Sequence, residues 1–544
     1  MSKEILPEDH VAAASPDAQI KDVPDEKKEW RPSFNPWLIA ASVMLATFME
    51  VLDTSVANVA LPHISGNLSA TTEEATWVLT SYLVANAIIL PATGWLTSVF
   101  GRKRFLIACI IIFTVASALC GAAASLDMLI LARILQGAGG GALQPIAQSV
   151  LLESFPPEKR GSAMALYGLG VVVAPIIGPT LGGWITDNYS WRWIFYINIP
   201  IGALAVFMAN SFVEDPPYIK NRKPGRIDYI GFSLMALGLA MAELTLDMGQ
   251  QNDWFQSSWI VFTTLTAATA LLLFIVWEFY VDEPIVNLRI FKNRNFAVGT
   301  VLIASVGVVL YGSTALLPLF LQTLLGYPAV QSGLAVSPRG LGSAISMLIV
   351  GRLVGKLDGR FLIMFGFIVL AFATNWLAGI NLDISTSTLT FPIIVSGFAM
   401  GFVFVPLTTM AMGTLSNEQV GNAAGIYNLM RNLGGSIGIA AMTTLLARGT
   451  QTHQAALSPN LNQYSPAFQH LFEQLYNGFL ATGGDPVAAT QQAYNAIYGI
   501  LLRQAALLSY IDNFRLMALL CLICVPTALL FKRVRNAKAP VGVH

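Results

Sequence analysis

Two carboxylates, Glu50 and Asp53, stand in the otherwise apolar stretch ATFMEVLDTSVANVALP, residues 46–62. At about 100° per residue they share one face of a helix with Thr54, and Asn58 lies at the edge of that face. A charge near the centre of a bilayer costs about 2.5 to 3.5 kcal/mol, so an acid there normally faces water or a partner and marks an ion or proton path. We interpret Asp53, and with it Glu50, in this way. The alternative is a carboxylate that only reaches headgroup water near the outer interface.

Arg133 is a cation about one and a half turns inside another apolar stretch, between LDMLILA and ILQGAGGGALQP. A guanidinium in such a place requires an anionic partner or water. Asp53 is the predicted partner, because both residues lie in the outer half of their stretches by residue count. The pair has two interpretations: Asp53 exchanges a proton while Arg133 modulates it, or the two form a fixed structural ion pair.

Other polar side chains within apolar stretches extend this candidate site. Three further charged residues within apolar stretches are candidate functional residues, namely Glu243, Arg339 and Arg431. Helix capping or bonding between helices would also account for them. The candidate lining of a substrate cavity comprises Glu50, Asn58, Gln136, Glu243, Arg339 and Arg431. Carboxylates suit cationic compounds and arginines suit anionic, fatty-acid-like ones, so the pattern leaves the charge of a substrate open.

The sequence gives little support for catalysis. It contains no GxxxxGK[ST] run for ATP, no histidine deep in an apolar stretch and no cluster of metal-type ligands. Its four cysteines lie in apolar segments, where packing is the expected role. The GAGGGA run, residues 137–142, formally fits a dinucleotide fingerprint but follows no strand, so we expect it to allow close helix packing. We expect no enzyme activity, no cofactor and no metal site.

The composition predicts the elements that position these residues. Of 544 residues, 55% are hydrophobic and only 11% are charged, against roughly 25% charged in an ordinary soluble domain. The net charge of +0 argues against nucleic-acid binding. We predict an all-α polytopic membrane protein, with about 20 residues per crossing. Its fourteen helices would begin near residues 36, 74, 105, 127, 162, 193, 227, 258, 296, 330, 361, 389, 422 and 511.

Basic residues gather in the short loops after even-numbered spans, as in Arg102, Lys103 and Arg104, while the opposite short loops carry only Arg192. The positive-inside rule therefore predicts that both terminal tails, 1–35 and 533–544, are cytoplasmic.

An internal repeat predicts two related halves. Gly94, Leu96, Gly101 and Arg102 at the end of the second span resemble Gly351, Leu353, Gly359 and Arg360 at the end of the tenth. We predict six-helix bundles over 36–213 and 296–532, joined by a linker with two additional spans over 214–295. The second bundle would include a long outer loop, 448–510, in which a helix is plausible over 485–503.

The fifth span, YGLGVVVAPIIGPTLGG, combines prolines that bend a helix with glycines that let a neighbour approach. Tight packing alone would explain this pattern. A moving gate between two halves would also require it. The candidate gate residues are Pro175, Gly178, Pro179, Gly182 and Gly183.

Several of these motifs together resemble the major facilitator superfamily, and within it the fourteen-helix drug:proton antiporters of the EmrB/QacA type. The resemblance covers about 36–532 and rests on LDTSVANVALP (52–62), the Arg133 segment, APIIGPTLGG (174–183), WRWIFYINIPIG (191–202) and the basic turns. In that family an acidic residue commonly follows Gly-x-Leu-x in the loop motif. Here Ser98 stands at that place, although Gly94, Gly101 and Arg102 fit.

The resemblance implies a major facilitator fold and proton-coupled export of hydrophobic or amphipathic compounds by alternating access, driven by the proton gradient. Asp53 would carry the proton, Arg133 would modulate it, and Glu50 would be a second acid or a contact for a substrate cation. The EmrB-like outer loop implies a Gram-negative inner membrane, a periplasmic adaptor and an outer-membrane channel. A proton-coupled symporter that imports a solute and a membrane-embedded receptor or enzyme remain the alternatives.

Overall fold

The computed structural model describes residues 32–220, 228–483 and 485–532. All regular elements in these ranges are α-helices or short 3-10 helices. The predicted cytoplasmic tails lie outside the described residues, apart from 32–35. Part of the predicted linker, 221–227, also lies outside them.

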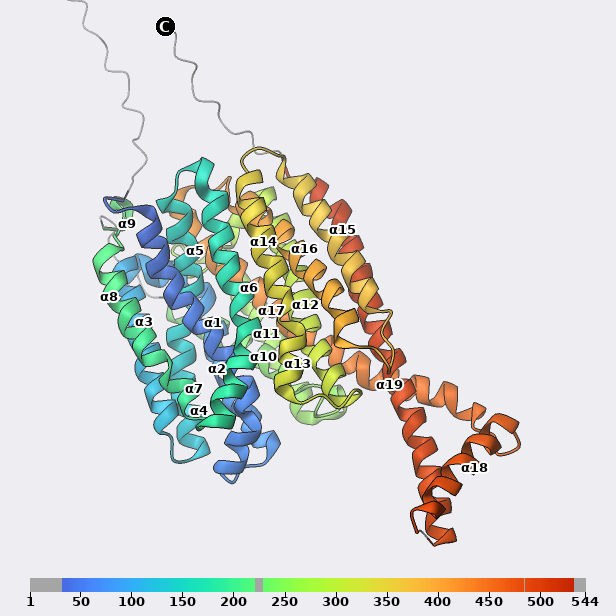
Figure 1. The fold of residues 1–544 in the computed structure, drawn as a ribbon. Coiled ribbons are helices and arrows are strands. Elements are labelled where there is room, and N and C mark those ends of the chain that lie inside the picture. The colour runs from blue at the N-terminus through green and yellow to red at the C-terminus, as the bar shows by residue number, and fades with distance from the viewer. Residues whose placement is uncertain (1–31, 221–227, 484, 533–544) are drawn as a thin grey trace, which may run out of the picture. The chain divides into compact units, whose positions relative to one another are not determined.

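The chain up to residue 212 forms eight α-helices and one 3-10 helix (Figure 1). They are α1 (Pro36–Asn67), α2 (Thr72–Phe100), α3 (Arg102–Ala122), α4 (Leu126–Gly140), α5 (Leu143–Ser154), η1 (Pro157–Lys159), α6 (Arg160–Asn188), α7 (Trp193–Tyr196) and α8 (Asn198–Phe212).

The middle of the chain forms three α-helices and two 3-10 helices. They are α9 (Pro217–Lys220), α10 (Tyr229–Met248), η2 (Trp254–Gln256), α11 (Ser258–Tyr280) and η3 (Leu288–Lys292).

The remaining part contains α12 (Arg294–Thr323), α13 (Ala329–Val336), α14 (Pro338–Leu353), α15 (Gly359–Leu377), α16 (Thr386–Met412), α17 (Asn417–Leu457), η4 (Ser458–Asn460), α18 (Pro466–Ala481), α19 (Pro486–Thr527) and η5 (Ala528–Leu530).

Thirteen stretches of the described chain are helical, long enough and apolar enough to cross a membrane. They correspond to the predicted spans except the thirteenth, which is α17. Glycines and amide side chains lower the hydropathy of α17, but its buried residues run from Val420 to Met442. This length is about 35 Å of helix, which is enough to cross the hydrocarbon layer. We therefore count α17 as a further span, which gives this multi-pass membrane protein fourteen spans among its described residues.

Helix packing follows two groups. In the first, α1 packs against α5, α6 and α8, and α4 packs against α2 and α3. In the second, α12 packs against α17, α14 against α16, and α15 against α16 and α19. The groups meet where α6 lies beside α14 (Figure 1) and where α17 lies beside α2 and α5. The helix α10, paired with α11, packs against both α2 and α17.

The repeat glycines lie where the two groups meet. A side chain at Gly94 of α2 would collide with the backbone of Asn422 in α17, at 2.7 Å from its Cα. Gly351 of α14 has the equivalent position against α6, where its carbonyl accepts a hydrogen bond from the Ser162 hydroxyl at 3.3 Å. Both glycines therefore permit close approach between the groups at the end of the helices that carries the basic loops, which we call the basic end.

The connection 448–510 is largely helical rather than irregular. The helix α17 continues to Leu457, α18 follows, and α19 runs unbroken from Pro486 into the last span. Figure 1 shows α18 beside the first half of α19, and none of its residues is buried. The predicted helix at 485–503 is confirmed as the start of α19, where Asp485 accepts hydrogen bonds from the first turn.

Candidate functional site

Asp53 lies at the centre of a buried polar cluster between α1, α4 and α8. Its Oδ2 accepts a hydrogen bond from Arg133 Nη1 at 2.7 Å, and both side chains are almost fully buried. Its Oδ1 accepts bonds from Gln136 Nε2 at 2.9 Å and from Asn198 Nδ2 at 2.6 Å. The predicted contact between Asp53 and Arg133 is confirmed, and Gln136 joins the same cluster.

The other groups around Arg133 hold its guanidinium in place. Its Nε donates to the carbonyl of Val78 at 3.0 Å, and its Nη1 also reaches Gln136 Oε1 at 2.8 Å. The ring of Tyr82 lies 4.2 Å from the guanidinium carbon, which gives a cation–π contact. Carboxylate, carbonyl, amide and ring thus surround this cation, as a desolvated charge requires.

Glu50 lies one turn before Asp53 and is equally buried. Its Oε1 accepts weak hydrogen bonds from the Tyr82 hydroxyl at 3.2 Å and from Asn86 Nδ2 at 3.3 Å. Its Oε2 accepts from Gln144 Nε2 at 2.7 Å. Tyr82 therefore joins the surroundings of both acids, because its hydroxyl bonds to Glu50 and its ring covers Arg133.

Gln144 connects Glu50 to the second helix group. While its amide nitrogen donates to Glu50, its Oε1 accepts a hydrogen bond from Nη2 of Arg431 in α17. Gln144 stands directly after the break between α4 and α5, which Gly140 and Gly141 accompany. A side chain at Gly140 would lie 3.3 Å from the Glu50 Cγ, so the glycine run brings this part of the chain close to α1. Close packing is thus confirmed for the GAGGGA run.

A second set of amide and hydroxyl contacts crosses between the groups nearby. Asn428 of α17 accepts a hydrogen bond from the Tyr167 hydroxyl of α6 at 3.1 Å. Its amide donates to Gln148 Oε1 of α5 at 2.6 Å. Of these neutral groups, Tyr167 also contacts Arg431. The region between α1, α5, α6 and α17 is therefore polar and buried.

The loop motif forms a buried ion pair at the basic end. Arg102 donates two hydrogen bonds to Glu153 of α5, at 2.8 and 2.9 Å. The Tyr218 hydroxyl donates to the same carboxylate at 2.6 Å and accepts from Arg102 at 2.9 Å. Burial raises the pKa of the Tyr218 phenol, so it stays protonated at neutral pH. The Asn417 carbonyl, at the start of α17, lies 3.4 Å from this hydroxyl.

The turn into α3 explains Gly101 of the same motif. Gly101 has φ of 82°, a left-handed conformation that favours glycine, and it both ends α2 and begins α3. Asp215 accepts a hydrogen bond from the Lys103 backbone at 2.8 Å. Ser98, where an acid is common in the family, only bonds to its own helix at Trp95. The carboxylates at this turn are Asp215, which accepts from the Lys103 backbone, and Glu153, which pairs with Arg102.

The glycines and prolines of α6 lie along α1 and against the second group. Gly178 packs on Ser55, whose hydroxyl donates to the Pro175 carbonyl at 3.0 Å. Gly182 packs on Val56 of α1. Gly183 and Pro179 face α13, at Val330 and Gly333 respectively. Of the five candidate gate residues, Gly183 and Pro179 therefore lie where the two groups meet, whereas Pro175, Gly178 and Gly182 contact α1 within the first group. A role of the five in gating stays a prediction.

Three predicted site residues lie apart from these clusters. Asn58 is exposed, and its amide donates to the Thr54 carbonyl of its own helix at 3.2 Å. Glu243 of α10 is buried and contacts Ser436 of α17. Arg339 is buried in the second group, where Nη1 donates to Thr314 at 2.9 Å. The predicted lining is therefore divided among several places.

Sequence reasoning assigned no role to several residues that complete the site. Asn198 lies in a segment noted only for its family resemblance, and Gln144 and Tyr82 are ordinary polar residues at sequence level. Glu153 is a carboxylate near a span end, but Lys159 and Arg160 follow it closely, so the sequence did not indicate Arg102 as its partner.

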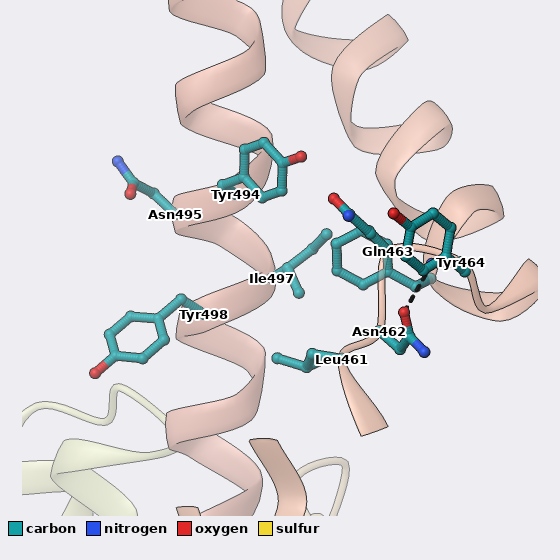
Figure 2. Close-up of a pocket in the computed structure, with 9 residues that line it drawn as sticks. Leu461, Asn462, Gln463, Tyr464, Tyr494, Asn495, Ile497 and Tyr498 are labelled. Carbon is teal, nitrogen blue, oxygen red and sulfur yellow. Dashed lines mark hydrogen bonds between the residues drawn. The ribbon is translucent and has the colours of Figure 1, made fainter. Parts of the chain in front are cut away.

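A separate hollow of about 570 Å³ lies on the helical connection, between the start of α18 and α19 (Figure 2). Figure 2 shows Tyr494, Ile497 and Tyr498 on α19 and the segment from Leu461 to Tyr464 opposite them. None of the predicted proton-coupling or cavity residues lines it. The hollow is therefore separate from the polar cluster around Asp53.

Residues 43–439 match the model of a protein family described as the Major Facilitator Superfamily. The chain is 41% identical to "Multidrug export protein EmrB" of Escherichia coli (strain K12) over 441 residues, which cover 80% of this chain and 85% of EmrB. It is 40% identical over 441 residues to "Fatty acid resistance protein FarB" of Neisseria gonorrhoeae, with 80% of this chain and 86% of FarB covered.

Among solved structures, the fold is similar to that of the proton:xylose symporter XylE, with a TM-score of 0.56. The similarity covers 89% of this chain and 94% of the XylE chain, at 13% sequence identity. At this identity the likeness concerns the fold alone.

Proposed function

Because the chain belongs to the major facilitator superfamily, whose members are membrane transporters and not enzymes, we propose that it exports hydrophobic or amphipathic compounds in exchange for protons. The family membership confirms the resemblance drawn from the sequence motifs. Small-molecule substrates and a lipid bilayer follow from that membership. Multidrug export is the function that the name of EmrB gives for that relative, and at 41% identity it is the first expectation for this chain.

One observation carries the proton-coupled form of this proposal. Asp53 is a fully buried carboxylate that an arginine and two amides hold from two other helices. Judged by stability alone, a buried ion pair of this kind is a poor choice compared with apolar packing. Protonation of Asp53 would release Arg133 and change the contacts of α1 with α4 and α8. A proton can therefore alter helix packing at this point.

The transport cycle we propose is alternating access between the two helix groups. The gradient supplies enough energy, because one charge that crosses 100 mV is worth about 2.3 kcal/mol. Opening at the basic end would break the contact of Gly94 with α17 and the contact of Tyr218 with the Asn417 carbonyl. Opening at the other end would separate Pro179 and Gly183 of α6 from α13. No cofactor takes part in this scheme.

We further propose a location in the inner membrane, with both termini cytoplasmic. The basic residues near Arg102 and in the other loops at that end support this orientation. A periplasmic adaptor and an outer-membrane channel would complete a tripartite pump. The helical connection formed by the end of α17, by α18 and by the start of α19 is the part that would meet the adaptor.

The test is substrate-dependent proton movement in everted membrane vesicles, with lipophilic cations, weak acids and neutral dyes as candidate substrates. Asp53→Asn should abolish substrate uptake into the vesicles and the accompanying proton efflux. Asp187→Asn is the matched control, because Asp187 is exposed at the end of α6, and it should behave as the wild type.

Two results would contradict the proposal. Uptake that persists in Asp53→Asn would show that Asp53 does not couple the proton. Proton and substrate movement in the same direction would indicate a symporter instead.

A further inference from the structure

Arg431 is a buried cation whose hydrogen bonding is incomplete. Its relative exposure is 1%, and it lies on α17 of the second helix group, which packs against α5 of the first and is joined to α6 by the bond from Tyr167 to Asn428. Its Nη2 donates hydrogen bonds to Gln144 Oε1 and to Asn432 Oδ1, the latter at 3.2 Å. The buried Nε and Nη1 have no hydrogen-bond partner among the described residues. A guanidinium carries five N–H donors in a planar fork, so this side chain has unused donors.

Arg133 and Arg339 also have a buried nitrogen without a partner among the described residues, Nη2 and Nε respectively, so the buried arginines differ chiefly in their surroundings. Arg133 has Asp53 as a direct carboxylate partner, and Arg102 has Glu153. Arg339 has none in the described ranges, but its contact is to Thr314 of its own helix group. Arg431 instead reaches its nearest acid, Glu50, only through Gln144, in the other helix group. Arg431 is therefore a desolvated cation between the groups, and the amide of Gln144 lies where a carboxylate partner would be expected.

We propose that Arg431 binds the carboxylate of an anionic amphiphile, and that Gln144 reports this binding to Glu50. The inference rests on the proposed export function and gives its substrate class. A carboxylate is the planar acceptor that matches a guanidinium fork with two parallel bonds. Tyr167 contacts Arg431 and stacks on Phe404, and both rings are fully buried in this conformation. The apolar part of the compound would lie against these rings once the two helix groups separate.

Gln144 has a fixed direction in this arrangement. Its carbonyl oxygen faces the cation and its amide nitrogen faces the acid. A carboxylate that takes Arg431 removes the partner of the Gln144 oxygen, and the amide is then free to turn away from Glu50. Glu50 would keep only the two longer bonds from Tyr82 and Asn86. Substrate binding in one helix group thus changes the hydrogen bonding of an acid in the other.

The test is the binding of dansylamino-undecanoate and of its methyl ester to the purified full-length chain in lipid nanodiscs. The two probes share the chain and the fluorophore and differ only in the carboxylate. Arg431→Gln should weaken binding of the acid about ten- to hundredfold and change binding of the ester by less than about twofold. Arg448→Gln makes the same substitution at an exposed position of α17 and should bind both probes as the wild type does.

A second variant removes the anion site without removing the arginine. Gln144→Glu places a carboxylate of the protein beside Arg431 and should weaken binding of the acid selectively. Equal losses for acid and ester in Arg431→Gln would overturn the proposal. So would acid binding at the wild-type level in either variant, and this second arm remains decisive if Arg431→Gln does not fold.

Export of the acid from proteoliposomes separates this inference from the proposed function. If the wild type binds the acid but moves it without regard to a proton gradient, the proposed coupling fails and the site stands. If the wild type exports it with protons and Arg431→Gln does so equally well, the site fails and the function stands.

Discussion

At the scale of single residues, each buried charge near the group contacts has a different degree of neutralisation. Arg102 and Glu153 form a two-bond pair, Asp53 and Arg133 form a one-bond pair supported by amides, and Arg431 has no direct acid. This order suggests different duties. The two-bond pair holds structure, whereas a group with fewer or exchangeable partners can respond to a proton or a ligand.

The two-bond pair can be tested by a double-mutant cycle in detergent. Arg102→Met or Glu153→Met alone should lower the free energy of unfolding by about 3 to 5 kcal/mol, because each leaves an uncompensated buried charge. The double variant should recover about half of that loss or more. Arg104→Met, at an exposed neighbour, is the control for hydrophobic substitution. Strictly additive losses would show that the two side chains do not stabilise each other.

Tyr218 contributes to the same cluster through its hydroxyl. Tyr218→Phe should lower the free energy of unfolding by about 1 to 2 kcal/mol, since it removes a short bond to a carboxylate. Burial raises the pKa of this phenol above its ordinary value, so the loss should be the same at pH 6 and pH 8. Tyr229→Phe, at an exposed tyrosine, should cost almost nothing. A loss that changes between these pH values would mean that the cluster titrates there.

At the scale of elements, the contact of α2 with α17 depends on the absence of a side chain at Gly94. Gly94→Ala should force the two helices apart at the basic end and reduce transport at least about tenfold. Separation should also increase alkylation of Ser98→Cys, which lies one turn along the same face. The four native cysteines are buried and give little background.

Gly66→Ala is the matched control for this substitution, because no atom lies within 4 Å of the added Cβ. It should leave transport and alkylation unchanged. If Gly94→Ala transports normally, the close approach of α2 and α17 has no part in the cycle.

The sequence predicted the fourteen helices from runs of about 20 apolar residues. It predicted the pairing of Asp53 with Arg133 for a different physical reason. A charge in an apolar span requires an opposite charge, so two such residues predict each other. Gln144 and Asn198 carry no such requirement, because a neutral amide can also bond to its own helix, as Asn58 does. Glu153 was missed because its partner lies some fifty residues away and looked like a topology signal.

The helical form of 448–510 was also only partly predictable. Its polar composition resembles that of an irregular loop, and none of the residues by which α17 extends into it is buried. Contacts between α17 and α19 stabilise this extension, including His453 with Asp512 at 2.8 Å and Gln454 with Tyr498 at 3.1 Å. Such pairings join residues far apart in sequence, so no local sequence pattern predicts them.

At the scale of the whole molecule, the exposed aromatic residues of this connection can be tested as an adaptor surface. Tyr464→Ser should lower export from intact cells several-fold and leave uptake by everted vesicles unchanged, because only the cell assay needs an adaptor. Tyr280→Ser, at another exposed tyrosine, should affect neither assay. Equal loss in cells and vesicles would mean that Tyr464 serves the transporter itself.

The unbroken course of α19 has a mechanical consequence. Its 42 residues measure about 63 Å, roughly twice the thickness of the hydrocarbon layer. About 30 Å of stiff rod therefore projects from the last span. Tilted ring contacts of Phe468 and Phe472 with Tyr494 join α18 to it. If the second helix group tilts by about 10°, the far end of the rod sweeps through about 5 Å. A helix of this length would thus transmit each conformational change of the transport cycle to a protein bound at its far end, outside the bilayer.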